Sequence, residues 1–316
     1  MKTVFFIMIG VGIALFLQAK DLKGFHIEPD FVKDGDYMGI MIKDSIVLDF
    51  EKIEGEKFFG ISDIAYDAKN HLLYAINDRG VMFTFSLKIE EGKIKQLKAL
   101  QAMPLKDKDG KRLKGYFRDS EGLCMVDEGL AISFERRPRV SLFDKSMRTK
   151  KEVQIPKKLE DIKSYQGKND ALEALTFSKN LGFITAAEYP LRGMKKGYHD
   201  IYTQKGKLCA IKRDRFNAIV AMEMMDDGDI LLLQRKFLWK SLTMENTLSK
   251  VHTKQIKEGV CKVDILAWMS NKDGWDIDNF EGLTSYHDNL YLMVSDDNGN
   301  FFQKTILTLF EIKEKR

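Results

Sequence analysis

The sequence predicts an all-β fold, a single β-propeller of five to six four-stranded blades that is closed by strands from near the N-terminus. Three observations predict it. Short apolar segments have the length of strands, and a motif recurs about every 50 residues. The last repeat contains only about three strands before Arg316. Together they indicate one ring-shaped domain.

Strands are indicated by segments of four to eight residues that are rich in strand-forming side chains. The clearest are residues 72–76, 129–134, 230–233 and 290–294. Turn-forming residues at 67–70, 226–229 and 287–289 separate them, as expected for tight hairpins. No amphipathic helix of three turns follows the first 20 residues, so the chain is predicted to be mostly β.

One acidic motif repeats along the chain. Its clearest copies lie at residues 119–123, 169–175 and 278–283, and looser copies begin at residues 60 and 217. When Asp63, Glu121, Glu173, Ile219 and Glu281 are taken as equivalent, the spacings are 58, 52, 46 and 62 residues. Such periods are typical of propeller blades.

The fifth unit needs an outer strand from elsewhere. Residues 37–42 and 46–50 are strand-like and are expected to supply it, because closure of this kind removes exposed sheet edges. A sixth, degenerate blade would also fit the pattern.

The N-terminus has the pattern of a secretory signal peptide. Lys2 precedes an apolar run over residues 4–17, and Ala19 precedes the charged Lys20. An uncleaved membrane anchor is the alternative, but the run is short of the about 20 residues that a spanning helix needs. We therefore expect a signal peptide over residues 1–19 and one β-propeller domain over residues 20–316. The mature chain is expected to be periplasmic or secreted, without stable membrane insertion.

Charge gives no sign of a nucleic-acid partner. Without Lys2 the chain has 50 Lys and Arg against 47 Asp and Glu. The basic cluster over residues 145–168 has no aromatic residue before Tyr165 and is interpreted as a solvated strand and loop. The oligomeric state stays open.

Three cysteines in an oxidising compartment allow one disulfide. We expect Cys209 to pair with Cys261. Cys124 lies in an apolar strand and is expected to be a buried free thiol.

The motif opens each blade, and the first strand of a blade lines the central channel. The glutamates Glu121, Glu173 and Glu281 are therefore expected to meet near the axis. A second acidic set follows each motif by 14 or 15 residues, and the fourth unit has Gln234-Arg235 at the corresponding place. This second set contains Asp78, Glu135, Glu188 and Asp296.

Carboxylates brought this close repel one another, so protons or a cation must neutralise them. Oxygen ligands without a His or Cys cluster favour Ca²⁺. The expected metal ligands are Glu121, Glu173, Glu281, Asp119 and Asp296. The alternative is that the acids are structural latches, which accept hydrogen bonds from neighbouring blades and from arginines.

If a cation is bound, Arg79, Arg136 and Arg235 are candidates to hold an anionic substrate bidentately. Metal-assisted phosphoester hydrolysis would follow. The expected catalytic residues are Glu121, Glu173, Glu281, Asp78, Arg79 and Arg235. No Gly-x-Ser-x-Gly elbow, Walker loop or Gly-x-Gly-x-x-Gly occurs in the sequence. Residues 107–110 read as a hairpin turn rather than half of a calcium loop.

In their order, these motifs resemble the family described as having the esterase-like activity of phytase. The matching pieces are residues 60–62, 76–80, 119–123, 172–176, 279–283 and 294–298, so the resemblance covers residues 60–312. It implies an exported β-propeller that hydrolyses an ester or phosphoester through its acidic residues. Asp63 stands where the family usually has Gly, Ala174 replaces another Gly, and Gln234 stands where Glu is common.

Two functions follow as hypotheses. The first is an exported phytase-like esterase or phosphoesterase that acts on a small anionic ester with a calcium-type cation. The second is a non-catalytic periplasmic propeller that binds a ligand or an envelope protein, its acidic ring serving only closure. Because the fourth unit lacks both acids, we expect the site on the side formed by units one, two, three and five.

Overall fold

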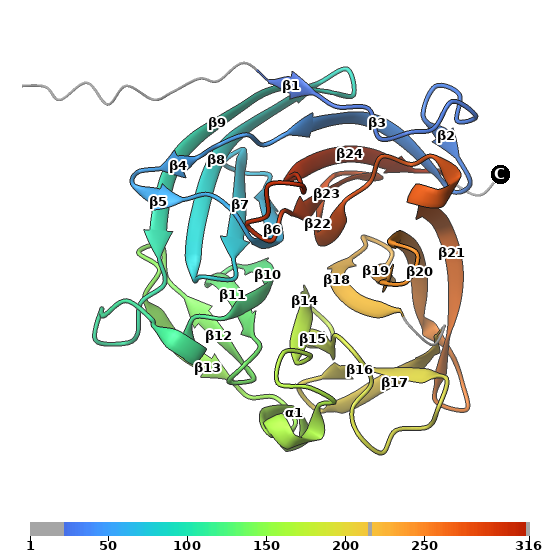
Figure 1. Cartoon of the computed structure of the whole chain (residues 1–316). Helices are drawn as coiled ribbons and strands as arrows, with labels where there is room; N and C mark the ends of the chain where they lie inside the picture. Colours follow the sequence, from blue (N-terminus) through green and yellow to red (C-terminus); the bar gives the residue numbers. More distant parts are fainter. Residues whose placement is uncertain (1–21, 214–216, 314–316) are drawn as a thin grey trace, which may run out of the picture.

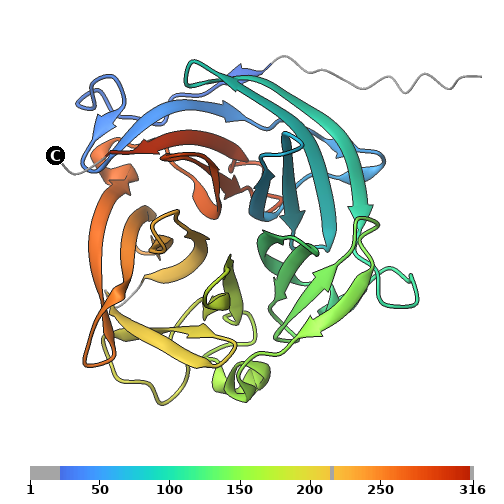
Figure 2. The ribbon, with the colours of Figure 1, turned by 180° about the vertical axis from the view of Figure 1, so that it is seen from behind.

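The computed structural model describes residues 22–213 and 217–313. Antiparallel sheets stand as blades around a central axis, in order of sequence around the ring (Figure 1). The view from behind shows the same ring (Figure 2). Within the described ranges no helix has the length and apolar character needed to cross a membrane, and the expected signal peptide lies outside them.

Each blade is an antiparallel sheet whose first strand is innermost, and the bounds of all strands are as follows. Blade one contains β6 (Ile61–Asp67), β7 (Leu72–Asn77), β8 (Val81–Glu90) and β9 (Lys93–Pro104), and blade two contains β10 (Ser120–Val126), β11 (Gly129–Phe134), β12 (Arg139–Phe143) and β13 (Thr149–Val153). Blade three contains β14 (Leu172–Ser178), β15 (Gly182–Ala187), β16 (Tyr198–Thr203) and β17 (Gly206–Lys212), and blade four contains β18 (Ala218–Met224), β19 (Ile230–Leu238), β20 (Thr243–Lys257) and β21 (Val260–Ser270). Blade five contains β22 (Asn279–His287), β23 (Leu290–Asp296) and β24 (Ile306–Ile312).

The N-terminal part of the chain closes the ring, as predicted. Strand β3 (Ile40–Val47) pairs antiparallel with β24 from Ile40↔Ile312 to Val47↔Ile306 and is the fourth strand of blade five. The remaining strands are two-residue pieces: β1 (Lys23–Gly24), β2 (Asp36–Tyr37), β4 (Lys52–Ile53) and β5 (Glu56–Lys57). The described residues therefore form five blades, and the sixth, degenerate blade that the sequence also allowed does not exist among them.

Helical segments are short and lie in the connections. They are α1 (Lys157–Glu160), η1 (Gly115–Phe117), η2 (Ile162–Ser164) and η3 (Asn271–Asp273). Segment η1 lies in the loop that leads from blade one into blade two, just before the second copy of the acidic motif.

The apolar core is divided among the seams between blades. Five clusters of buried side chains occur, and each joins residues of neighbouring blades. In one of them Ala65 and Ile76 of blade one pack with Leu123 and Ile132 of blade two. Burial of both faces of every sheet explains why the strands read as nearly continuous apolar runs. The seams also bring the inner strands together around the axis.

Blades three and four are joined more tightly than the other blades. A parallel bridge pairs Ala210 of β17 with Val260 of β21, so the two blades form one eight-stranded sheet. The Cys209–Cys261 disulfide spans the same seam, which confirms the predicted pairing. Cys124 is free and buried, also as predicted.

Candidate functional site

A β-bulge in every inner strand fixes where the motif side chains point. In blades three and five the pairing with the second strand skips one residue, Glu173 or Glu281. In blade two it skips Glu121 and Gly122, which lie opposite the single residue Ser133. An unpaired bulge residue is free to turn its side chain away from the sheet. The bulge therefore aims these three glutamates at one end of the channel.

The bulges correct the sequence alignment of the other two blades by one residue. In blade one the skipped residue is Ser62, and Asp63 instead pairs with Ile76. In blade four it is Val220, one residue beyond Ile219. The residue types near the motif are similar enough to hide this shift in the sequence.

Asp63 is consequently a latch and not part of the acidic ring. It is 1 % exposed, and its carboxylate accepts N–H bonds from Leu123 at 2.7 Å and Leu283 at 3.0 Å. It thus ties blade one to blades two and five. For this residue the structural alternative considered in the sequence is confirmed.

The second acidic set lies at the end of the second strand of four blades. Each of these residues comes directly after the residue that pairs with the first strand just before the bulge. Asp78, Glu135, Glu188 and Asp296 follow the residues that pair across the bulge. In blade four this place belongs to Arg235 rather than Gln234, which pairs with Ile219. The ring therefore contains one built-in cation, opposite carboxylates from four other blades.

Two overlapping triads of carboxylates form on blades two and three. Oxygen atoms of Asp119, Glu121 and Glu135 lie within 4.8 Å of one another, and so do oxygens of Glu135, Glu173 and Glu188. Glu135 belongs to both triads. Every donor is a carboxylate oxygen, the ligand type that hard cations prefer.

Burial and mutual repulsion disfavour ionisation in these triads. Burial, together with Glu135 and other acids, raises the pKa of Glu121 well above its usual range. Burial and then Glu121 do the same to the pKa of Glu173. For Glu135, burial followed by Asp119 and Glu188 raises the pKa to about 9. Without a cation the triads therefore hold protons, since a full set of negative charges is too costly.

Arg235 bridges three blades by contacting two carboxylates, Glu188 of the second triad and Glu281. Its Nη2 lies 2.8 Å from Glu188 Oε1, and its Nη1 pairs with Glu281 Oε1. Asn279 also donates to Glu281 Oε1 at 2.7 Å. Burial raises the pKa of Glu188 to about 7 even though Arg235 opposes the shift. Arg235 is thus a latch between blades three, four and five.

The blade-one side of the ring contains an unsatisfied oxygen. Asp78 and Asp296 approach the same residue, Gly60, where an added Cβ would lie 2.8 Å from Asp78 Oδ1 and 4.0 Å from Asp296 Oδ1. Within the described residues Asp78 Oδ1 is buried without a hydrogen-bond partner. Burial raises the pKa of both carboxyl groups. Such an oxygen is normally satisfied by a proton, water or ion.

Two arginines remain at the mouth of the channel. Arg79 Nε lies 3.3 Å from Asp78 Oδ2, and Arg136 Nε lies 2.8 Å from Asp119 Oδ2. Their side chains are 51 % and 41 % exposed, against 19 % for Arg235. Arg79 and Arg136 therefore present guanidinium groups to solvent beside the acidic ring.

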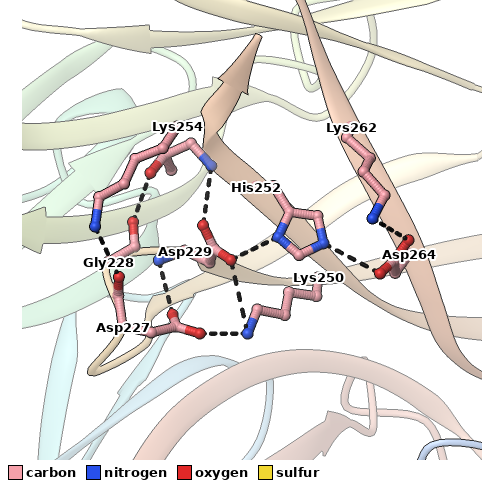
Figure 3. A network of polar contacts seen from close by, with 9 residues as sticks. Asp227, Gly228, Asp229, Lys250, His252, Lys254, Lys262 and Asp264 are labelled. Atoms are coloured by element: carbon pink, nitrogen blue, oxygen red, sulfur yellow. Dashed lines mark hydrogen bonds and ion pairs between the residues drawn. The ribbon is translucent and has the colours of Figure 1, made fainter. Parts of the chain in front are cut away.

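A second polar network lies in blade four, where lysine and histidine side chains contact three aspartates. His252 lies between Asp229 (Nδ1 to Oδ2, 2.7 Å) and Asp264 (Nε2 to Oδ2, 3.1 Å), and Lys250 pairs with Asp227 (Figure 3). This network joins the β18–β19 turn to the outer strands, at the end of blade four remote from Arg235.

The structure thus brings together most, but not all, of the residues expected from the sequence. Glu121, Glu173 and Asp119 enter the triads, whereas Glu281 is bound by Arg235 and Asp296 lies on the Gly60 side. Glu135 and Glu188 complete the triads, although the sequence placed them only in the second acidic set. Their offset of 14 or 15 residues from the motif was the signal that could have included them.

Fold and site define a five-bladed β-propeller with a carboxylate-lined channel end that is able to hold a cation. Residues 56–299 match the family model described as "Phytase-like: Esterase-like activity of phytase", and the chain belongs to this family. The blade-closing strands β3 and β24 lie outside the matched residues.

Other comparisons are distant. No curated protein matches the chain in sequence. Among solved structures, the WD40 domain of Pan2 from Neurospora crassa is similar with a TM-score of 0.36 at 10% identity, over 82% of this chain and 90% of that chain. A PQQ-bound aldose sugar dehydrogenase from Streptomyces coelicolor gives 0.41 at 10% identity, over 84% and 98%. U3-55K gives 0.44 at 10% identity, over 85% and 98%.

Proposed function

We propose that this chain is an exported hydrolase of small anionic esters, phosphoesters above all, that works with Ca²⁺ bound in the triads. The observation that carries the proposal is the pair of triads sharing Glu135. Family membership supports esterase-like chemistry. The Cys209–Cys261 disulfide supports an oxidising, periplasmic or secreted location.

The residues fit a calcium-type cation. Asp119, Glu121 and Glu135 would hold it on blade two, and Glu173 and Glu188 would extend the site to blade three. The donors are all oxygen, and burial followed by repulsion from the other acids raises the pKa of Glu121 and Glu173. A bound cation would offset the cost of ionising them. In the blade-four network Lys250 already lies beside Asp227 and Asp229.

Arg79 and Arg136 would bind the anionic ester at the mouth, because in the described part of the chain each guanidinium group contacts only one carboxylate. Arg235 would act as a positioning residue that fixes Glu188 and Glu281. With the cation bound, a ring carboxylate oxygen that does not contact it would accept the proton of the attacking water. When bound, the cation would supply charge stabilisation of the phosphoryl oxygen and a lower pKa for water.

Calcium titration of thermal stability, run beside a p-nitrophenyl phosphate assay, tests the proposal. At a free concentration of 100 Kd, Ca²⁺ should stabilise the protein by about 2.7 kcal/mol. At roughly 2–4 °C per kcal/mol, this is about 5–11 °C in Tm. Glu135→Gln should remove most of the shift and the activity. The matched control is Glu128→Gln, an exposed acid of the same blade that pairs only with Lys151. The proposal would be excluded if neither the chelator nor Glu135→Gln changed the Tm or the rate of p-nitrophenyl phosphate hydrolysis.

The second candidate, a non-catalytic propeller that binds a ligand or an envelope protein, is favoured by the latches. Asp63 on the first strand of blade one and Arg235 on the second strand of blade four show that acidic and basic residues near the axis do hold blades together. In this case no ester would be turned over, and Glu281→Gln would lower the Tm equally with and without Ca²⁺. The same melting and activity experiment therefore separates the two candidates.

A further inference from the structure

Exposed aromatic side chains gather at the end of the propeller where the acidic ring lies. Among the described residues Phe301, Phe302 and Trp239 are the most exposed large apolar side chains, at 95 %, 84 % and 81 %. Trp239 lies in the turn between the second and third strands of blade four, and the two phenylalanines lie in the equivalent turn of blade five. These turns follow Arg235 and Asp296 of the ring, so they stand at the same end of the channel.

Blade two adds two more aromatic side chains to this end. Tyr116 and Phe117 of η1 are 66 % and 46 % exposed. Arg136 and Arg137, from the turn between the second and third strands, place their guanidinium carbons 5.5 and 4.9 Å from the centroids of these two rings. We call the five aromatic side chains the aromatic rim: Tyr116, Phe117, Trp239, Phe301 and Phe302.

The other end of the channel has no such rim. Five turns join the first and second strands of the blades there, at residues 68–71, 127–128, 179–181, 225–229 and 288–289. All of them are described, and none contains an exposed large apolar side chain. The exposure of aromatic residues is therefore one-sided.

The loop of blade five that presents two rim residues is fixed at both sides. Asp278 accepts hydrogen bonds from the Gln303 side chain at 2.9 Å and from the backbone N–H of Lys304 at 2.8 Å. On the other side, Asp297 accepts from the N–H of Gly60 at 2.9 Å. Apolar side chains held in water by a fixed loop are unfavourable, and such exposed groups mark interaction sites.

Charge is also distributed unequally between the two ends. The five turns between second and third strands, at the rim end, contain eight Lys and Arg against four Asp and Glu. The five turns at the other end contain two against six. The segments that lead from one blade into the next are balanced, with 14 against 13 among their described residues. The rim end is thus the more positive end.

The acids at the rim end lie mostly near the axis. Asp78, Glu135 and Glu188 are members of the ring, and the fourth acid is Asp297 in the blade-five loop. Cations and aromatic side chains therefore surround a charged centre. Protein interfaces usually have the opposite arrangement, an apolar centre within a polar rim.

A bilayer surface suits this arrangement better than a protein partner does. Aromatic rings favour the level of the lipid headgroups, where one part of the ring is in apolar surroundings and another is in water. Lysine and arginine beside such rings add attraction to anionic lipids. The separate loops of blades two, four and five can enter a soft, flat surface without a matching shape on the partner.

We propose that the propeller docks on a membrane containing anionic lipids through the end that carries the aromatic rim. The rim side chains enter the headgroup layer, and the cations of the same turns contact lipid phosphates. The acidic ring then faces the membrane surface. This docking does not rest on the proposed hydrolase function.

Sedimentation with large unilamellar vesicles tests the docking, in the presence of a chelator so that no divalent cation links the ring to lipid. The wild type should bind vesicles of equal parts phosphatidylglycerol and phosphatidylcholine, and should bind phosphatidylcholine alone more weakly. Replacing both Phe301 and Phe302 by serine should lower the partition coefficient by about tenfold or more, because the apolar surface that enters the bilayer is lost. The matched control, Ile265→Ser, removes a 61 % exposed side chain from the outer strand of blade four and should leave binding unchanged.

Exposed lysines test the electrostatic part of the docking. Lys240→Gln and Lys304→Gln, in rim-end turns, should each weaken binding to the anionic vesicles by about fivefold. Lys69→Gln and Lys179→Gln, in turns at the other end, should not change it. All four positions are exposed, so these variants are expected to fold.

Tryptophan fluorescence identifies the surface that touches the bilayer. The chain has three tryptophans, of which Trp239 is 81 % exposed, Trp268 41 % and Trp275 2 %. Anionic vesicles should shift the emission to shorter wavelength, and Trp239→Phe should remove the shift whereas Trp268→Phe should keep it.

The following outcomes would overturn the docking. Absence of binding to either kind of vesicle would leave a protein partner for the rim, and equal binding to both kinds would refute the role of the lysines. Equal binding by the double serine variant and Ile265→Ser would exclude the rim, as would an emission shift that is lost in Trp268→Phe instead. Because neither measurement involves turnover, each result is independent of the hydrolase function.

Discussion

Replacing both Cys209 and Cys261 by alanine removes the covalent link across the seam of blades three and four. The two cysteines are 52 residues apart, and the loop they close contains β18, β19 and β20, three of the four strands of blade four. In the chain-entropy model a loop of this length stabilises the folded state by about 4 kcal/mol. At roughly 2–4 °C per kcal/mol, the variant should melt about 8–16 °C lower than the oxidised wild type.

Urea denaturation followed by circular dichroism measures the change, with and without reductant. The reduced wild type should match the double variant, and reductant should not affect the variant. Cys124→Ala is the matched control because that thiol is buried and free, so its response to reductant should equal that of the wild type. A difference below about 1 kcal/mol between the oxidised wild type and the double variant would refute the loop-closure reasoning.

Two further predictions concern the inner strands. Burial raises the pKa of Glu223 to about 6, against an ordinary value of 4.5. Its contribution to stability is therefore full below pH 4.5 and is lost, by about 2 kcal/mol, as the pH rises through 6. Glu223→Gln should flatten this part of a pH series of denaturation midpoints, and an unchanged slope would contradict the assignment. A Cβ on Gly122 would lie 2.5 Å from the backbone carbonyl oxygen of Glu173, so Gly122→Ala should lower the free energy of unfolding by about 1–3 kcal/mol. Gly24→Ala, which meets nothing within 4 Å, should cost less, and equal midpoints for the two variants would argue against backbone crowding.

The five-blade fold was predictable because the motif marks the strand that every blade places at the axis. Closure was predictable as well, since the strand-like residues 37–42 and 46–50 had no sheet of their own in the sequence. In the structure one continuous strand, β3, takes this place. The register of the first strand of each blade against the second was not predictable, because a β-bulge inserts one residue and no residue type marks its position. Asp63 was therefore aligned with the motif glutamates, although it occupies the place of Gly122. The family's usual Gly at this position was consistent with the structural register.

The sequence predicted that the site is an acidic ring. It did not predict which carboxylates of the ring form triads and which are bound by Arg235. Which carboxylates form triads depends on Arg235, whose reach to Glu188 and Glu281 across the ring is a tertiary property. The spacing of acidic residues in the sequence does not show that Glu281 and Glu135 differ in their contacts. The structure instead binds Glu281 with a cation and places Glu135 at the centre of both triads.

The pairing of β3 with β24 has a consequence for the order of events during synthesis. Val47 and its partner Ile306 are 259 positions apart, so translation at about 5–20 residues per second separates them by about 13–50 s. Throughout this interval the half-apolar strand β3 lacks its partner β24, and the edge that β24 covers in the folded protein can pair with another chain. Such distant pairing also slows folding in general. The nascent chain thus has a defined window in which a holding chaperone would protect it.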